Sequence, residues 1–170
     1  MLKYLLAAAA LAAAISGSAL AAEQTFEARA NGQIEFTMPS GNIGCLYTPE
    51  GGTDTYMPVD GGPELICERV EPSYVTVILS DVDEAEVIEN PGEQSCCGAE
   101  NIFAYGNTVE LEGFECESEE TGLTCENDEG YGFTMARAGI ELFDPDPAEQ
   151  AGGGAAEGAD DEDDEDDDDV

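Results

Sequence analysis

The chain has 170 residues, of which 40 are Asp or Glu and only four are Lys or Arg, so that its net charge is −36, and it contains no His. A surface with this charge repels phosphate groups, which excludes nucleic acids and anionic membranes as partners. The absence of His also excludes the Ser-His and Cys-His dyads of many hydrolases.

Residues 1–22 have the pattern of a secretory signal peptide. Lys3 precedes the apolar run LLAAAALAAAI, and Ala19 and Ala21 occupy the small-residue positions of a cleavage site. The apolar run is too short to span a bilayer. We therefore expect a periplasmic or secreted protein that has no membrane attachment once the signal is removed.

Residues 23–143 are predicted to form one all-β domain, a small disulfide-stapled sandwich or barrel-like fold. Short runs of β-type sequence recur between Gly and Pro breaks, at the spacing expected for such folds. The predicted strands span residues 25–30, 34–38, 43–48, 64–70, 74–80, 85–89, 101–106, 108–117, 122–127 and 132–143. The segment 81–90 also fits one or two turns of helix.

Six cysteines lie in this domain, and all six are assigned to disulfides. An even number of cysteines in a small exported domain is typical of a disulfide framework. None of the spacings is the C-x₂-C of zinc sites, so we expect neither a metal centre nor another cofactor. The six are Cys45, Cys67, Cys96, Cys97, Cys116 and Cys125.

The stretch CESEETGLTC predicts a hairpin with the four-residue loop 119–122. In this register Cys116 faces Cys125, and directly opposed residues are close enough for a disulfide. Gly122 would supply the positive φ that such loops favour late in the turn. A three-residue loop would instead turn Cys125 to the other face of the sheet.

The other four cysteines leave more than one pairing open. Cys45 and Cys67 flank a turn-rich segment, and a bridge between them would contribute roughly 3 kcal/mol by closing that loop. Cys96 and Cys97 then either bond each other or form crossing pairs with Cys45 and Cys67, since neighbours in a strand point to opposite faces.

Residues 144–170 differ in composition from the domain. Alternating Pro and Asp lead into a Gly- and Ala-rich stretch, and the chain ends in an acidic run, EGADDEDDEDDDDV. Low hydrophobicity with high net charge predicts a disordered tail.

No catalytic residue emerges from the sequence. After removal of the signal no Lys remains for a Schiff base. The stretches DVDEAE (81–86) and ENDEG (126–130) offer carboxylates to calcium, but neither matches an EF-hand loop, and solvated acidic loops are the favoured interpretation. For Arg137, an ion pair with a nearby acid is favoured over an anion site.

Several motifs occur together in the domain: FTMPSGNIGC (36–45), LIC (65–67), AYGN (104–107), GFECES (113–118), GLTCEN (122–127) and GYGFTMARAGIELF (130–143). With these motifs the chain resembles a bacterial secreted family, the domain-of-unknown-function 6636 family. The resemblance implies an exported, cysteine-stapled domain without an established activity, and it transfers no catalytic residue. It also implies well-separated middle cysteines, whereas here Cys96 and Cys97 are adjacent.

The expected function is that of an exported, non-enzymatic binding module. Its charge favours basic proteins, cationic peptides or divalent cations as partners. The alternative is a carboxylate-based or calcium-assisted hydrolase of the cell envelope, which would require a pocket with two facing acids.

Overall fold

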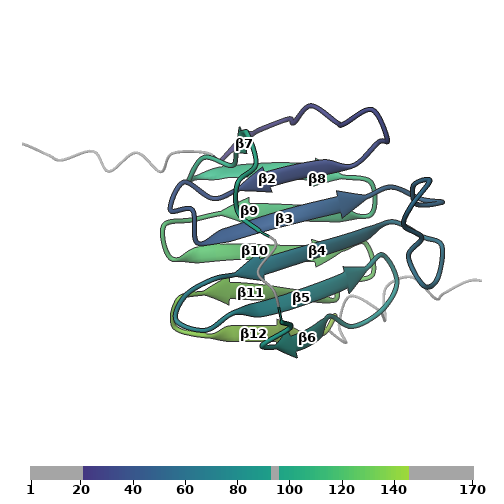
Figure 1. Ribbon diagram of the computed structural model, residues 1–170. Helices are drawn as coiled ribbons and strands as arrows, with labels where there is room; N and C mark the ends of the chain where they lie inside the picture. Colours follow the sequence, from purple (N-terminus) through teal and green to yellow (C-terminus); the bar gives the residue numbers. More distant parts are fainter. Residues whose placement is uncertain (1–20, 93–95, 146–170) are drawn as a thin grey trace, which may run out of the picture.

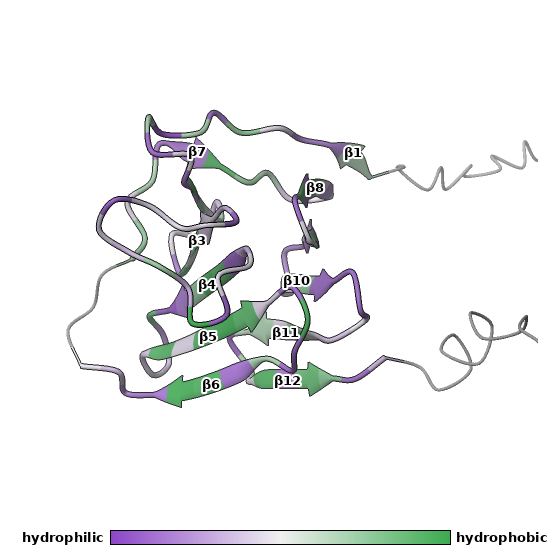
Figure 2. Ribbon diagram, turned by 90° about the vertical axis from the view of Figure 1, so that its right-hand side faces the viewer, coloured by the Kyte–Doolittle hydropathy of each residue, from purple (hydrophilic) through white to green (hydrophobic). Residues whose placement is uncertain are grey.

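The computed structural model describes residues 21–92 and 96–145, in which twelve strands form two six-stranded sheets. The sheets pack face to face, one in front of the other in Figure 1 and side by side in Figure 2. The prediction of an all-β, disulfide-bonded sandwich is therefore confirmed. Apart from residues 21–22 and 144–145, the predicted signal peptide (1–22) and disordered tail (144–170) lie outside the described residues.

The front sheet has the strand order β6-β5-β4-β3-β2-β7. Its strands are β2 (Ile34–Thr37), β3 (Ile43–Thr48), β4 (Glu64–Arg69), β5 (Val75–Ser80), β6 (Glu86–Glu89) and β7 (Asn101–Ile102). Strands β2 to β6 are consecutive antiparallel neighbours, whereas β7 pairs with β2 in parallel. β6 and β7 lie at opposite edges of this sheet, and between them in the chain Cys96 and Cys97 lie on its outer face, next to Gly44 and Glu68.

The back sheet has the order β1-β8-β9-β10-β11-β12. Its strands are β1 (Ala22–Glu23), β8 (Asn107–Leu111), β9 (Phe114–Ser118), β10 (Gly122–Asn127), β11 (Gly132–Ala136) and β12 (Ile140–Phe143). Strands β8 to β12 form an antiparallel meander, and β1 pairs with β8 in parallel.

Several predicted strands differ from the observed ones. Residues 25–30 form no strand, because the chain turns at 29–33 and the Phe26 ring stacks on Phe36 with centroids 5.1 Å apart. Residues 108–117 are two strands joined by a tight turn at Gly113, whose φ is +84°. The run 132–143 is also split, by a turn in which Ala136 and Gly139 exchange backbone hydrogen bonds. Residues 86–89 are a strand, so the helical alternative for 81–90 is wrong.

The core lies between the sheets and contains two of the disulfides. Cys45–Cys67 joins β3 to β4 and Cys116–Cys125 joins β9 to β10, each with a Cα–Cα separation of 4.1 Å. All four cysteines are buried, and each bonds the residue directly opposite to it. Since β3 and β4 face β9 and β10 across the sandwich, a covalent link fastens the centre of each sheet (Figures 1 and 2).

The hairpin between β9 and β10 has the predicted register, with Ser118 opposite Leu123 and Cys116 opposite Cys125. The role predicted for Gly122 is wrong, because Gly122 lies in β10 and its φ is not positive. A Cβ atom at this position would lie 2.6 Å from the carbonyl oxygen of Met135. Glycine is therefore required here for the close approach of β11, not for the turn.

Candidate functional site

The adjacent cysteines bond each other, which is the first of the two arrangements considered from the sequence. They lie on the outer face of the front sheet. A Cβ atom at Gly44 would lie 3.1 Å from Cys97 Sγ, and Cys96 Sγ lies 3.6 Å from the carbonyl oxygen of Glu68. Gly44 and Glu68 are paired neighbours of the bonded Cys45 and Cys67. Because side chains alternate along a strand, two disulfides lie on opposite faces of the β3–β4 pair.

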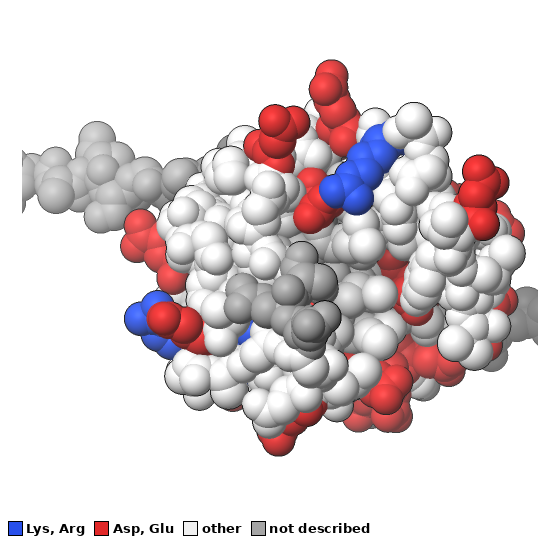
Figure 3. Space-filling model, viewed as in Figure 1, with Lys and Arg blue, Asp and Glu red and all other residues white. Residues whose placement is uncertain are grey.

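Beside the Cys96–Cys97 disulfide lies a groove of about 540 Å³, which we call the outer groove. Three half-buried apolar side chains, Leu46, Ile66 and Ile78, are paired across β3, β4 and β5 and form its floor. Figure 3 views this face and shows acidic side chains around its edge.

The charged residues of the outer groove are Arg29, Glu35 and Glu68. Arg29 forms an ion pair with Glu35 at one side. Glu68 Oε1 accepts hydrogen bonds from the Tyr74 hydroxyl, at 2.5 Å, and from Thr76 Oγ1, at 3.4 Å. These hydrogen bonds help to hold the Glu68 carboxylate in place.

A second candidate site lies at one end of the sandwich, which we call the acidic end. It consists of four loops, residues 49–63, 81–85, 112–113 and 128–131, which contain acidic residues and no Lys or Arg. The nine acidic residues are Glu50, Asp54, Asp60, Asp81, Asp83, Glu84, Glu112, Asp128 and Glu129.

The loop 49–63 is held in shape by its own hydrogen bonds. Gly51 N–H donates to the carbonyl of Gly61 at 2.9 Å, and Thr53 N–H donates to the carbonyl of Tyr56 at 2.6 Å. The Tyr56 hydroxyl donates to Glu64 at 2.5 Å. Burial, that hydrogen bond and the charge of Glu64 raise the pKa of Tyr56 to about 12.

A pocket of about 290 Å³ lies between this loop and the β5–β6 turn. Its acidic lining comes from Asp60, Glu64, Asp81, Asp83, Glu84 and Glu86, and it shares Ile78 with the outer groove. The two hollows therefore meet on the front sheet.

Apolar side chains are exposed in the same loops. Val59 is 96% exposed, Met57 60% and Val82 50%. Sequence reasoning missed Met57 and Val59 because they stand in a segment read only as a turn-rich loop, and Val82 because it stands in the acidic stretch 81–86. For Met57 and Val59 the signal was the run YMPV (56–59), which is apolar although it lies among glycines and acids.

The two stretches considered for calcium, 81–86 and 126–130, come together at the acidic end. Asn127 Nδ2 donates to the carbonyls of Ser80 and Asp83, at 2.9 and 3.2 Å. Among the described residues, however, no group of three or more acids or cysteines is arranged to hold a metal ion.

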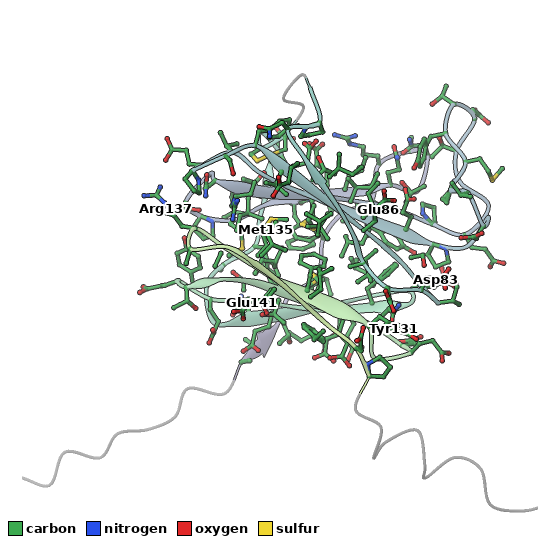
Figure 4. The ribbon with its side chains drawn as sticks, turned by 90° about the horizontal axis from the view of Figure 1, so that it is seen from below. Asp83, Glu86, Tyr131, Met135, Arg137 and Glu141 are labelled. Atoms are coloured by element: carbon green, nitrogen blue, oxygen red, sulfur yellow. A yellow bond between two sulfur atoms is a disulfide. The ribbon has the colours of Figure 1, made fainter. Side chains whose placement is uncertain are left out.

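The arginines lie outside the four loops of the acidic end. Arg137 pairs with Glu71 at 3.0 Å, so the predicted ion pair is confirmed, and Figure 4 shows Arg137 at the opposite end from Asp83. Arg69 is buried and donates from Nη1 to the carbonyl of Ala136 at 2.6 Å, which links the two sheets.

These features define a disulfide-bonded β-sandwich with one acidic loop end and one grooved sheet face. The chain belongs to the family of unknown function DUF6636, which matches residues 5–143. The resemblance inferred from the motifs is thereby confirmed. Neither a curated protein nor a solved structure matches the chain.

Two observations bear on localisation. The three disulfides are consistent with a protein of the periplasm or the extracellular space. In the part of the chain that the structure describes, no helix is both long and apolar enough to cross a membrane.

Proposed function

We propose that the protein is an exported, non-enzymatic binding module that captures basic proteins or cationic peptides at its acidic end, in the periplasm or outside the cell. The observation that carries this proposal is the exposure of Met57, Val59 and Val82 among nine acidic side chains. A partner that surrounds an apolar contact with Lys or Arg is complementary to this surface in charge and in hydrophobicity.

Charge and apolar contact have different roles in this proposal. The negative field attracts the partner and speeds association, and salt weakens it because the Debye length is about 10 Å at 0.1 M. The apolar side chains lose water on binding, and their contribution depends little on salt. Acids alone would attract any cation, whereas the exposed apolar side chains in the same loops select a partner with an apolar side chain of its own.

The proposal is tested with lysozyme as the basic protein, in calorimetric titrations at low salt and at about 0.3 M salt. We expect binding at low salt that weakens more than tenfold at the higher concentration. The double variant Met57→Ser/Val59→Ser should bind several-fold more weakly than the wild type at both concentrations.

The matched control is Leu142→Ser, which removes an apolar side chain that is 49% exposed on β12, outside the four loops. It should leave the affinity unchanged. Absence of binding at low salt, or equal losses in the control and in the double variant, would contradict the proposal.

The alternative, a carboxylate-based or calcium-assisted hydrolase, stays a prediction. It would gain support if calcium bound to the 290 Å³ pocket at the acidic end and if Asp81→Asn removed that binding.

A further inference from the structure

The three methionines that the structure describes differ sharply in exposure. Met57 is 60% exposed, whereas Met38 is 2% and Met135 0% exposed. Both buried methionines belong to the hydrophobic core, and Met38 Sδ also accepts a hydrogen bond from Ser118 Oγ at 3.2 Å. A reagent dissolved in water can therefore reach the side chain of Met57, while the sandwich shields the other two.

The backbone on both sides of Met57 is fixed. The carbonyl of Tyr56 accepts from Thr53 N–H at 2.6 Å, and the Tyr56 hydroxyl donates to Glu64 at 2.5 Å. On the other side, the Pro58 ring restricts φ, and the Pro58 carbonyl accepts from Gly61 N–H at 3.1 Å. The loop thus holds Met57 at the surface, where its side chain is available both to a partner and to an oxidant.

The other sulfur atoms of the described residues do not compete with Met57 for an oxidant. All six cysteines are bonded in disulfides, so none offers a thiol, the group that is ordinarily oxidised first. The charge of the chain selects among oxidants. Its negative field repels anions, whereas a neutral hydroperoxide approaches without hindrance.

We propose that Met57 is an oxidation site that regulates the acidic end: a neutral hydroperoxide converts its thioether to the sulfoxide, which weakens capture of the basic partner. This inference rests on the proposed function. A sulfur lone pair attacks the OH oxygen of the hydroperoxide, and the O–O bond breaks as the S–O bond forms. The proton passes to the leaving oxygen, which departs as an alcohol, or as water from hydrogen peroxide. Sulfur loses two electrons and the peroxide gains them.

The sulfoxide changes the apolar contact and leaves the charge of the surface as it was. Its oxygen is a polar acceptor, so burying it against an apolar side chain costs free energy. The acids still attract a basic partner, and Val59 and Val82, which cannot be oxidised in this way, keep their apolar surface. Oxidation should therefore lower the affinity by a similar factor at low and at high salt, and by less than Met57→Ser/Val59→Ser. Methionine sulfoxide reductases reverse the modification.

The test treats the full chain with hydrogen peroxide, removes the peroxide, and maps the added oxygen by peptide mass spectrometry. Met57 should gain one oxygen about tenfold faster than Met38 or Met135. The oxidised protein is then titrated with untreated lysozyme by calorimetry, at low salt and at about 0.3 M salt. We expect an affinity about threefold lower than that of the untreated protein at both concentrations. Equal oxidation of the three methionines, or an unchanged affinity after complete conversion of Met57, would overturn the proposal.

Two variants assign the effect to one sulfur atom. Met57→Leu keeps an apolar side chain without a thioether, so peroxide should leave its affinity for lysozyme at the value measured before treatment. The matched control Met135→Leu removes a buried thioether at nearly constant volume and should lose affinity on oxidation as the wild type does. A loss in Met57→Leu as large as in the wild type would show that oxidation acts elsewhere and would overturn the proposal.

The untreated protein separates this inference from the proposed function. If lysozyme binds before oxidation and equally well after it, regulation at Met57 is refuted while the proposed function stands. If lysozyme does not bind the untreated protein at low salt, the proposed function is contradicted, and the regulation that rests on it is contradicted as well.

Discussion

The outer faces of the two sheets differ sharply although both sheets belong to the same sandwich. On the back sheet, Glu110, Glu115 and Glu126 lie side by side across β8, β9 and β10, and the neighbouring row holds Thr108, Glu117 and Thr124. On the front sheet, the corresponding central positions are Leu46, Ile66 and Ile78. The centre of one face is thus entirely polar, whereas the other has apolar surface beside the Cys96–Cys97 disulfide.

This difference shows where binding is to be sought in a molecule that is acidic throughout. Acidity by itself does not single out a surface, because acids are found on both sheets and at the loop end. Apolar side chains among the acids are found in only two of the places described above, the acidic end and the outer groove. The proposed partner surface therefore depends on its apolar residues for position and on its acids for the sign of the partner's charge.

The largest expected effects come from removing the two buried disulfides. Because each sheet contains one of them, the two variants compare the stability of the sheets directly. The chain-entropy model gives about 3.4 kcal/mol for Cys45–Cys67, with a sequence separation of 22, and about 2.6 kcal/mol for Cys116–Cys125, with a separation of 9. Urea unfolding of the two double Cys→Ala variants should therefore show the greater loss for the front sheet. A greater loss for the back-sheet variant would contradict this order.

A smaller effect is expected where the Cys96–Cys97 disulfide contacts the front sheet. Gly44→Ala places a Cβ atom 3.1 Å from Cys97 Sγ and 3.2 Å from its Cα, which should destabilise the protein by about 1–2 kcal/mol. The control Gly98→Ala meets nothing within 4 Å and should change the free energy of unfolding by less than about 0.5 kcal/mol. Equal effects of the two variants would show that the disulfide does not press on the sheet.

A stabilising change is expected on the back sheet. Glu115 lies between Glu110 and Glu126, so Glu115→Gln should relieve two like-charge pairs and raise the free energy of unfolding by about 0.5 kcal/mol at low salt. The gain should shrink at 1 M salt, where the Debye length is about 3 Å. Glu117→Gln is the matched control, because its neighbours Thr108 and Thr124 are neutral. If this control raised the free energy of unfolding as much as Glu115→Gln does, relief of like-charge repulsion would not explain the gain.

The smallest effect at neutral pH concerns Tyr47, which projects from β3 towards Phe114 of β9, with ring centroids 6.2 Å apart. Burial, then the charge of Glu112 and a hydrogen bond to it, raise the pKa of Tyr47 to about 12. Because this pKa is higher in the folded state, the associated stability is complete below pH 10 and is lost as the pH rises to about 12. Tyr47→Phe should lose less stability than the wild type over this interval in urea titrations, and parallel losses would contradict the assignment.

The sequence predicted the fold class and the β9–β10 disulfide because both follow from local patterns. The alternation in FECES matches a strand with one dry and one wet face, and the register of Cys116 and Cys125 follows from their hairpin. The front sheet showed a different pattern. VTVILS and ELICER contain apolar residues at successive positions, which is typical of strands covered on both sides.

Neither candidate site could be predicted from the sequence. The outer groove requires Cys96 and Cys97 to lie on the outer face of the front sheet, and that position depends on the topology, which places β6 and β7 at opposite edges. The acidic end requires four loops that are far apart in the chain to meet. From the sequence, Met57 and Val59 are ordinary loop residues. Only the structure shows that their side chains are exposed and that Val59 lines a pocket together with Asp81.

The most direct test of the central claim is to map lysozyme on the protein by amide NMR shifts at low salt. The account predicts shifts in residues 49–63 and 81–85 and none in the strands that hold Glu110, Glu115 and Glu126. Shifts of equal size on that glutamate row would contradict it, because they would show that charge alone, without the apolar side chains of the acidic end, directs the partner.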